Sequence, residues 1–195
     1  ERAMDAVRTQ LIARGSRTVA LLDPPFAHSR QEPGYIKGYP PGVRENGGQY
    51  THAAAWVILA LAALGSGAEA AAVFHMVAPL NHARTPLDMA RYKVEPYVMA
   101  GDVYTRAPHA GRGGWTWYTG SAAWMYRAAV EGILGLRRQG GHGACHGAQR
   151  RAMDVVSVDF RWVCNADGPG ERPRGNEVAQ AVTRRRGQQL AAGQT

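Results

Sequence analysis

A proline- and glycine-rich stretch over residues 23–48 constrains this chain more than any other feature. Prolines and glycines recur through it in pairs or triplets, at 24–25, 33–34, 40–42 and 47–48. Proline removes a backbone donor and glycine weakens regular structure, so we expect no long helix or strand there. A loop of this length inside a compact domain is usually functional or disordered. Its tyrosines, basic residues, glutamate and asparagine favour a binding loop over a linker.

Apolar periodicity predicts helices on both sides of this loop. Apolar residues spaced three and four positions apart run over residues 3–14, 53–64 and 121–136, and a further helix is expected over residues 66–77. This spacing lines one face of an α-helix. We therefore expect these four segments to pack against one another through their apolar stripes.

Capping and breaking signals divide the helices. A Ser-x-x-Glu capping box opens the helix at residue 66. Thr85 with a following proline predicts another helix start, and we expect Pro96 to interrupt that helix, which then resumes to about residue 104. Strand patterns are nearly absent apart from a short candidate at 18–22. The sequence therefore predicts an all-α fold of helical hairpins packed side by side, with long functional loops at one end.

Composition separates residues 1–138 from residues 139–195. Over the whole chain, hydrophobic residues make up 45% and charged residues 19%, which excludes wholesale disorder. After residue 138, sustained apolar periodicity stops and the sequence becomes rich in Gly, Arg and Ala. We expect a poorly structured tail there, of divergent or frame-shifted sequence, that contributes little core.

The net charge of +8 invites a nucleic-acid interpretation, but the charge is uneven. Residues 1–136 hold 13 basic and 10 acidic residues, whereas residues 137–195 hold 10 basic and 5 acidic. Much of the excess lies in the tail, and no known nucleic-acid-binding motif accompanies it. We therefore expect no nucleic-acid partner.

Two helix starts have the character of an anion site. One begins at Gly47-Gly48 and runs to His52; the other contains Thr119, Gly120 and Ser121. The first turn of a helix has unpaired N–H groups and a partial positive charge. If both starts meet, they form a pocket for a phosphate-sized anion. Ordinary capping by Thr and Ser is the alternative that these residues leave open.

Aromatic residues gather near these helix starts, which is typical of sugar binding. Sugars stack their apolar faces on aromatic rings while polar groups hold the hydroxyls. The candidate sugar-binding residues are Tyr39, Arg44, Glu45, Asn46, Gln49, Trp115 and Trp117. The alternative, an aromatic core, is the expectation for Trp56 and Trp124 because they fall on the helical stripes.

Metal, cofactor and membrane signals are weak. His142, Cys145 and His146 form a short string, but no second ligand pair follows at zinc-like spacing, so we expect no metal. No dinucleotide or P-loop fingerprint is present, and we expect no cofactor. The longest apolar run, residues 53–64, is too short to span a bilayer. We expect a cytoplasmic segment without membrane contact, and leave open whether its parent protein carries spans.

Two long strings resemble glycoside hydrolase family 94, formerly called glycosyltransferase family 36. They are residues 34–52 (GYIKGYPPGVRENGGQYTH) and residues 111–124 (GRGGWTWYTGSAAW). Between them, residues 81–86 (NHARTP) and 91–97 (RYKVEPY) are similar to the branch of cyclic β-1,2-glucan synthases and β-1,2-oligoglucan phosphorylases. The resemblance covers about residues 1–138.

This resemblance implies an (α/α) toroid and inverting phosphorolysis of a β-glucan, with inorganic phosphate as co-substrate. The family's phosphate contacts fall on His52, Thr119 and Gly120 of this chain, and its contact to the leaving sugar falls on Arg44. An inverting hydrolase needs a second carboxylate to activate water. Phosphate already carries charge, so a positioned anion site replaces that base.

The family's general acid matches no residue of this chain. We expect that acid, and a further phosphate-binding arginine, to lie upstream in the parent protein. The chain is thus expected to be the C-terminal part of a catalytic domain, inactive without the remainder. The alternative, a non-catalytic carbohydrate-binding helical domain, would need no upstream acid.

Overall fold

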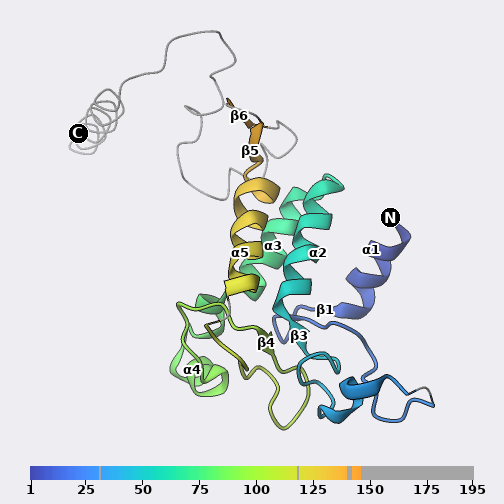
Figure 1. The fold of residues 1–195 in the computed structure, drawn as a ribbon. Helices are drawn as coiled ribbons and strands as arrows, with labels where there is room; N and C mark the ends of the chain where they lie inside the picture. Colours follow the sequence, from blue (N-terminus) through green and yellow to red (C-terminus); the bar gives the residue numbers. More distant parts are fainter. Residues whose placement is uncertain (31, 118, 140–141, 146–195) are drawn as a thin grey trace. The chain divides into compact units, whose positions relative to one another are not determined.

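Three helices packed side by side form the body of the protein (Figure 1). They are α2 (Thr51–Ala63), α3 (Gly67–Val77) and α5 (Thr119–Arg127), and α5 continues as a π-helical segment, η4 (Ala128–Ile133). The computed structural model describes residues 1–30, 32–117, 119–139 and 142–145. This part of the chain is mostly helical, as the periodicity predicted.

The core between these helices is built from small and branched apolar side chains. Its buried members on the three helices include Ala54, Ile58, Leu61, Val73, Met125 and Ala128. Gly132 belongs to this contact as well, because a Cβ there would lie 3.2 Å from Leu59 Cδ2. The close approach of α2 and η4 therefore leaves little room for a side chain at residue 132.

The predicted apolar stripe of α2 is displaced by about one residue. The buried face contains Ala54, Ala55 and Ile58, whereas Trp56 is 54% exposed and Leu64 is 49% exposed. The prediction of a core position for Trp56 is therefore wrong. α2 is apolar on nearly every side, so its spacing matches a helical stripe on more than one face.

The N-terminal helix is shorter than predicted. α1 (Arg2–Ala6) and the π-helical segment η1 (Val7–Leu11) lead into β1 (Ile12–Ala13), which pairs antiparallel with β2 (Thr18–Val19). The chain thus turns back into a two-stranded hairpin before the predicted end at residue 14.

α3 begins at the predicted residue, but its predicted capping box does not form. Ser66 is the N-cap and makes no side-chain capping hydrogen bond. Arg8 instead donates to Glu69 Oε2 at 2.9 Å and to Ser66 Oγ at 3.3 Å. Both capping side chains therefore fasten the N-terminal helix to α3.

α4 (Pro86–Tyr92) follows a short 3₁₀ turn, η3 (Pro79–His82), and confirms the start predicted at Thr85. The Thr85 hydroxyl accepts from the backbone N–H of Asp88 at 3.1 Å. α4 ends at Tyr92, and the following residue, Lys93, has a left-handed φ of 59°. The predicted resumption after Pro96 is wrong, since a turn at residues 96–97 and irregular chain lead from there to β4 (Asp102–Val103).

The long loop over residues 23–48 contains one 3₁₀ turn, η2 (Gly34–Gly38), and ends in β3 (Gln49–Tyr50). β3 pairs antiparallel with β4, with Tyr50 opposite Asp102. This short pairing leads directly into α2 and brings the two predicted loop regions together.

A third antiparallel strand pair follows η4. β5 (Leu136–Gln139) pairs with β6 (His142–Cys145), and it crosses the predicted boundary at residue 138. The rest of the predicted tail, residues 146–195, lies outside the described residues.

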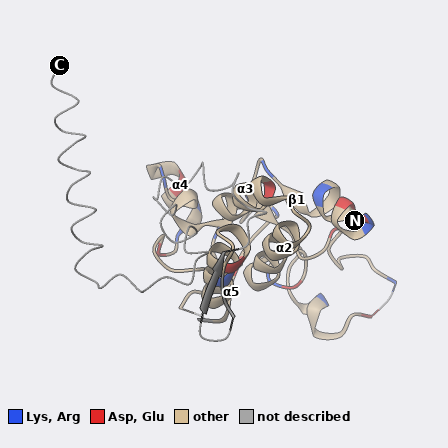
Figure 2. Cartoon of the chain, turned by 90° about the horizontal axis from the view of Figure 1, so that it is seen from above, with Lys and Arg blue, Asp and Glu red and all other residues tan. Residues whose placement is uncertain are grey.

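Residues of both charge signs occur close together along the ribbon around α1 and α5 (Figure 2). Arg8 pairs with Asp5, and Arg127 pairs with Glu131 one helical turn away. Within the described ranges, no helix combines the length and the apolar character needed to cross a bilayer.

Candidate functional site

The Glu45-Asn46-Gly47-Gly48 string forms a tight loop that presents Arg44. A Cβ on Gly48 would lie 2.7 Å from the Arg44 carbonyl oxygen, so only glycine allows this closure. The Asn46 amide oxygen accepts from the Phe26 N–H at 2.7 Å, and its nitrogen donates to the Tyr39 carbonyl at 2.7 Å. The loop is therefore fixed by its own asparagine and glycines.

Arg44 lies between aromatic rings at the mouth of the site. Its backbone has a left-handed φ of 48°. Its guanidinium carbon lies 4.1 Å from the ring centre of Trp115 and 5.5 Å from that of Tyr39. Arginine binds aromatic faces by cation–π attraction. The rings therefore hold the guanidinium in place without using its hydrogen-bond donors.

The β3–β4 pairing places Asp102 beside the start of α2. Thr51, the first residue of α2, donates its N–H to the Gly101 carbonyl at 2.9 Å. Asp102 is 2% exposed, and its Oδ1 accepts from the Trp115 N–H at 3.0 Å. Gly114 makes room for this carboxylate, because a Cβ there would lie 2.2 Å from Oδ1.

His52 connects the starts of α2 and α5. The ideal Cβ position of Gly120 lies 3.9 Å from His52 Nδ1. On its other sides the imidazole contacts Trp56 edge-on, at 5.0 Å between ring centres, and Trp124 at 5.6 Å. Both tryptophans, which the sequence assigned to the core, thus support the predicted phosphate ligand.

These elements enclose a small pocket of about 140 Å³. It is lined by Arg44, Tyr50, His52, Gly101, Asp102, Trp115, Gly120 and Ser121. Its volume is several times the roughly 30 Å³ that one liquid water occupies. The structure thus brings together His52 and Gly120, which are 68 positions apart in the sequence.

Four polar atoms of this pocket are buried without a hydrogen-bond partner. They are Arg44 Nε, His52 Nε2, Asp102 Oδ2 and Ser121 Oγ. An unsatisfied buried polar group costs about 1–3 kcal/mol, and native proteins keep few of them. Their convergence on one cavity indicates a polar ligand, and most of these atoms can donate to it.

The electrostatics of the pocket are mixed. Arg44 carries a fixed positive charge, and Glu45 Oε2 lies 3.6 Å from its Nε. Burial raises the pKa of Asp102 above its ordinary value, while the Trp115 N–H and the Arg44 charge act in the opposite direction. A partly buried site of this kind strengthens every charge interaction with a bound ion.

The predicted sugar-binding residues divide into two groups. Tyr39 and Trp115 flank Arg44, and Trp117 is 67% exposed with its indole N–H donated to Glu95 at 3.2 Å. Asn46 and Gln49 are buried, and both amides bind within the protein. These contacts hold the loop in place, and the sugar contact of the two residues stays a prediction.

Sequence reasoning missed Asp102 as a residue of this site, and it recognised Ser121 only as part of a helix start. Asp102 lies in a two-residue strand that no periodicity could reveal. A signal did exist for Ser121, since it follows Thr119-Gly120 in the second long string. Thr119 is the first residue of α5.

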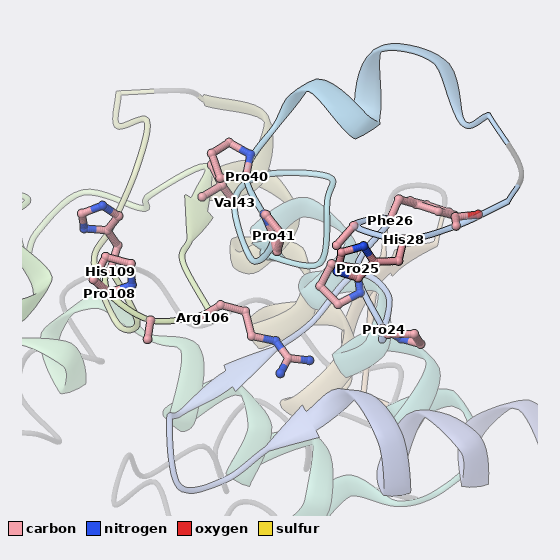
Figure 3. A pocket seen from close by; sticks show the side chains of 13 residues that line it. Pro24, Pro25, Phe26, His28, Pro40, Pro41, Val43, Arg106, Pro108 and His109 are labelled. Atoms are coloured by element: carbon pink, nitrogen blue, oxygen red, sulfur yellow. The ribbon is translucent and has the colours of Figure 1, made fainter.

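A larger cavity of about 860 Å³ lies among the loops (Figure 3). Pro24, Pro25 and Phe26 line one part of it, and Pro40, Pro41 and His109 line others. An ion pair between Asp23 and Arg106 ties two of these loops together. None of the unpartnered buried atoms among the described residues belongs to this cavity, so the smaller pocket is the candidate site.

Metal ligands do not gather in the part of the chain that the structure describes: no group of three or more His, Cys, Asp or Glu residues is placed to hold an ion there. The His142–His146 string falls partly outside these residues.

The fold and the site together define a mostly helical domain with a small polar pocket where two helices begin. Residues 1–135 match the catalytic domain of the glycosyl hydrolase 94 superfamily, and the chain belongs to that family. The resemblance noted from the two long strings is thus confirmed.

Relatives of this chain include a synthase and several phosphorylases. It is 59% identical over 139 residues to the cyclic beta-(1,2)-glucan synthase NdvB of Rhizobium meliloti (strain 1021), covering 71% of this chain and 5% of that protein. It is 34% identical over 116 residues to solabiose phosphorylase of Paenibacillus borealis, covering 59% of this chain and 15% of that protein. It is 32% identical over 139 residues to N,N'-diacetylchitobiose phosphorylase of Vibrio furnissii, covering 70% of this chain and 17% of that protein.

Proposed function

We propose that the 140 Å³ pocket binds inorganic phosphate and that this chain is part of a glycoside phosphorylase or glycosyltransferase acting on β-glucans. One observation carries the proposal. Donors from three separate elements, Arg44 Nε, His52 Nε2 and Ser121 Oγ, are buried without hydrogen-bond partners in residues that line one cavity. A phosphate oxygen accepts from each of these donor types.

The start of α5 adds to this attraction for an anion. The first turn of α5 contains Gly120 and Ser121, both in the pocket lining. Unpaired N–H groups at a helix start carry a partial positive charge. Gly120 lets an anion approach this backbone closely, since it has no side chain.

The family and the relatives support the reaction class. Two of the relatives are named as phosphorylases and one as a cyclic beta-(1,2)-glucan synthase. Because the identity to that synthase is 59%, we propose a β-1,2-linked glucan as the substrate of the parent protein. The chain spans 5% to 17% of the lengths of these relatives.

In the proposed reaction a phosphate oxygen attacks the anomeric carbon of the terminal glucose. The bond between that carbon and the glycosidic oxygen breaks with inversion, and the departing oxygen takes a proton from a carboxylic acid. Glucose 1-phosphate and a shortened glucan result. We propose that the acid is supplied by the remainder of an (α/α) toroid catalytic domain, with which this chain assembles.

His52 and Arg44 have different tasks in this scheme. His52 donates from Nε2 to phosphate and is held by the two tryptophan rings. Arg44 lies between the buried atoms and the half-exposed Trp115, where it contacts phosphate on one side and the leaving glucan on the other. This position refines the sequence prediction, which gave Arg44 a glucan contact alone.

The proposal is tested by initial phosphorolysis rates of the complete enzyme as functions of phosphate and of glucan concentration. Replacing His52 by Ala removes a hydrogen bond to a charged group, worth about 1.5–3 kcal/mol. We expect a loss of roughly tenfold to hundredfold in the dependence on phosphate, with little change in the dependence on glucan. Arg44→Ala should weaken both.

The matched control is His75→Ala, since His75 is an exposed histidine of α3. It should leave both dependences unchanged. If the His52→Ala variant keeps the wild-type dependence of rate on phosphate concentration, the phosphate assignment is overturned. That result would also favour the simpler role of this helix start as a structural cap.

A further inference from the structure

One acidic side chain lies among the donors of the proposed phosphate pocket. Asp102 is 2% exposed and lines the cavity together with Arg44, His52 and Ser121. Its Oδ2 is buried without a hydrogen-bond partner, as is one donor atom of each of the other three. A fully ionised carboxylate and a fully ionised anion repel each other. Binding an anion next to Asp102 therefore needs a proton between the two groups.

The carboxylate is held so that one oxygen remains for a ligand. Oδ1 accepts from the Trp115 N–H at 3.0 Å. Gly114 packs against the same oxygen, and a Cβ on Gly114 would lie 2.2 Å from it. Strand pairing through β3 and β4 fixes the backbone of Asp102. The group has little freedom to turn away from the cavity.

Tetrahedral anions differ in whether they bring a proton. At neutral pH, inorganic phosphate and arsenate keep at least one O–H group, whereas sulfate keeps none. An ionised carboxylate is an acceptor only, so it can bind the O–H of phosphate, and it opposes sulfate both by charge and by lack of a donor.

We propose that Asp102 selects phosphate over unprotonated oxyanions by sharing one proton with the bound phosphate. The inference rests on the proposed phosphate function of the pocket and adds a specificity-determining residue to it. The proton lies between Asp102 Oδ2 and one phosphate oxygen. The other phosphate oxygens accept from Arg44, His52 and Ser121.

The balance of forces around Asp102 agrees with a shared proton. Burial is the largest effect on its pKa and raises it, and the nearby Glu45 charge acts in the same direction. The Trp115 N–H, the Arg44 charge and the Arg44 backbone N–H lower it. A carboxyl in this setting binds a proton more readily than an exposed one.

The test measures binding of sodium phosphate, sodium arsenate and sodium sulfate to the full chain by isothermal titration calorimetry at pH 7. We expect wild-type protein to bind phosphate and arsenate with similar affinities, and sulfate at least tenfold more weakly. This ratio needs no variant, so it tests the proposal even if a substitution at Asp102 prevents folding.

Asp102→Asn is the matched substitution. Asparagine keeps an oxygen for the Trp115 N–H and places an NH₂ donor where Oδ2 was. That donor can bind an oxygen of any tetrahedral anion, whether or not the anion carries a proton. We expect the preference for phosphate over sulfate to fall to within about threefold, mainly because sulfate binds more tightly.

Glu131→Gln is the charge control. It removes the same single negative charge, 12 residues after Thr119 and therefore roughly 18 Å along the helix axis. It should keep the wild-type ratio of phosphate to sulfate affinity. If the ratio of phosphate to sulfate affinity falls in this control, the selectivity comes from net charge, and the role of Asp102 is overturned.

The outcomes separate the two proposals. Equal wild-type affinity for phosphate and sulfate overturns the role of Asp102 and leaves the phosphate function standing. An unchanged ratio in Asp102→Asn overturns it as well. Failure of the wild-type chain to bind any of the three anions contradicts the phosphate function itself, and the role of Asp102 with it.

Discussion

Gly114→Ala tests how tightly the fold holds the pocket carboxylate. The new Cβ would lie 2.2 Å from Asp102 Oδ1 and 2.7 Å from its Cγ, whereas ordinary contacts begin at 3.4 Å. The difference requires the carboxylate or the backbone to move by about 1.2 Å. Because Oδ1 also accepts from the Trp115 N–H at 3.0 Å, we expect this hydrogen bond to break.

A hydrogen bond to a charged group contributes about 1.5–3 kcal/mol. In a protein of 150–250 residues, each kcal/mol shifts the melting temperature by roughly 2–4 °C. Gly114→Ala should therefore lower Tm by about 3–12 °C. It should also weaken phosphate binding, since Asp102 moves within the pocket. Thermal unfolding followed by circular dichroism measures the first effect, and calorimetric titration the second.

Gly15→Ala is the control for this prediction. A Cβ at Gly15 would have no atom within 4 Å, so this variant shows only the effect of alanine on the unfolded chain, about 0.4–1 kcal/mol of stabilisation. If Gly114→Ala melts within about 1 °C of Gly15→Ala, the close packing of Gly114 against Asp102 is refuted.

Three further results are expected. Leu61→Ala should cost about 2–5 kcal/mol in urea unfolding because Leu61 is fully buried, whereas Leu64→Ala should cost less than about 1 kcal/mol; equal costs would contradict the buried face assigned to α2. Burial lowers the pKa of His82 to about 4, so the unfolded chain binds a proton there that the folded chain does not, and the free energy of unfolding should fall by up to about 3 kcal/mol as pH drops from 6.5 to 4. His82→Phe should flatten that part of the pH profile, and a profile parallel to wild type would contradict the assignment. Trp117→Ala should weaken glucan use by about twofold to tenfold without changing phosphate affinity, and a change in phosphate affinity would extend the pocket to Trp117.

Local signals in the sequence predicted the element order well. The start of α4 follows from Thr85, whose side chain caps the helix within one turn. α3 begins after Ser66 as predicted, although Ser66 makes no side-chain capping hydrogen bond. The long loop before α2 follows from its prolines and glycines. Such signals depend on the backbone of a few neighbouring residues, so tertiary packing changed them little.

The buried faces of α2 and α5 could not be predicted in the same way. Tyr126 fits the apolar spacing over residues 121–136 but is 68% exposed, while Met125 beside it is 3% exposed. Both helices carry apolar residues on several sides, so several stripes fit the helical period equally well. Which stripe is buried depends on the neighbouring helices.

The candidate site was predictable only where its residues lie in the two long strings. His52 and Gly120 are found there, and the structure brings them to one pocket. Asp102 reaches the pocket through the pairing of β3 with β4, which are two residues each. Pairs this short have no detectable alternation, and their contact is set by chain segments about 50 positions apart.

The central claim, that phosphate binds where α2 and α5 begin, is tested most directly by NMR titration of the full chain with inorganic phosphate. We predict that the Gly120 amide and the His52 ring resonances shift together and saturate with one Kd, while the Gly15 amide does not move. The His52→Ala variant should lose the Gly120 shift at the same phosphate concentration. Shifts confined to His28 and His109, which line the larger proline-rich cavity, would contradict the claim and place the anion elsewhere.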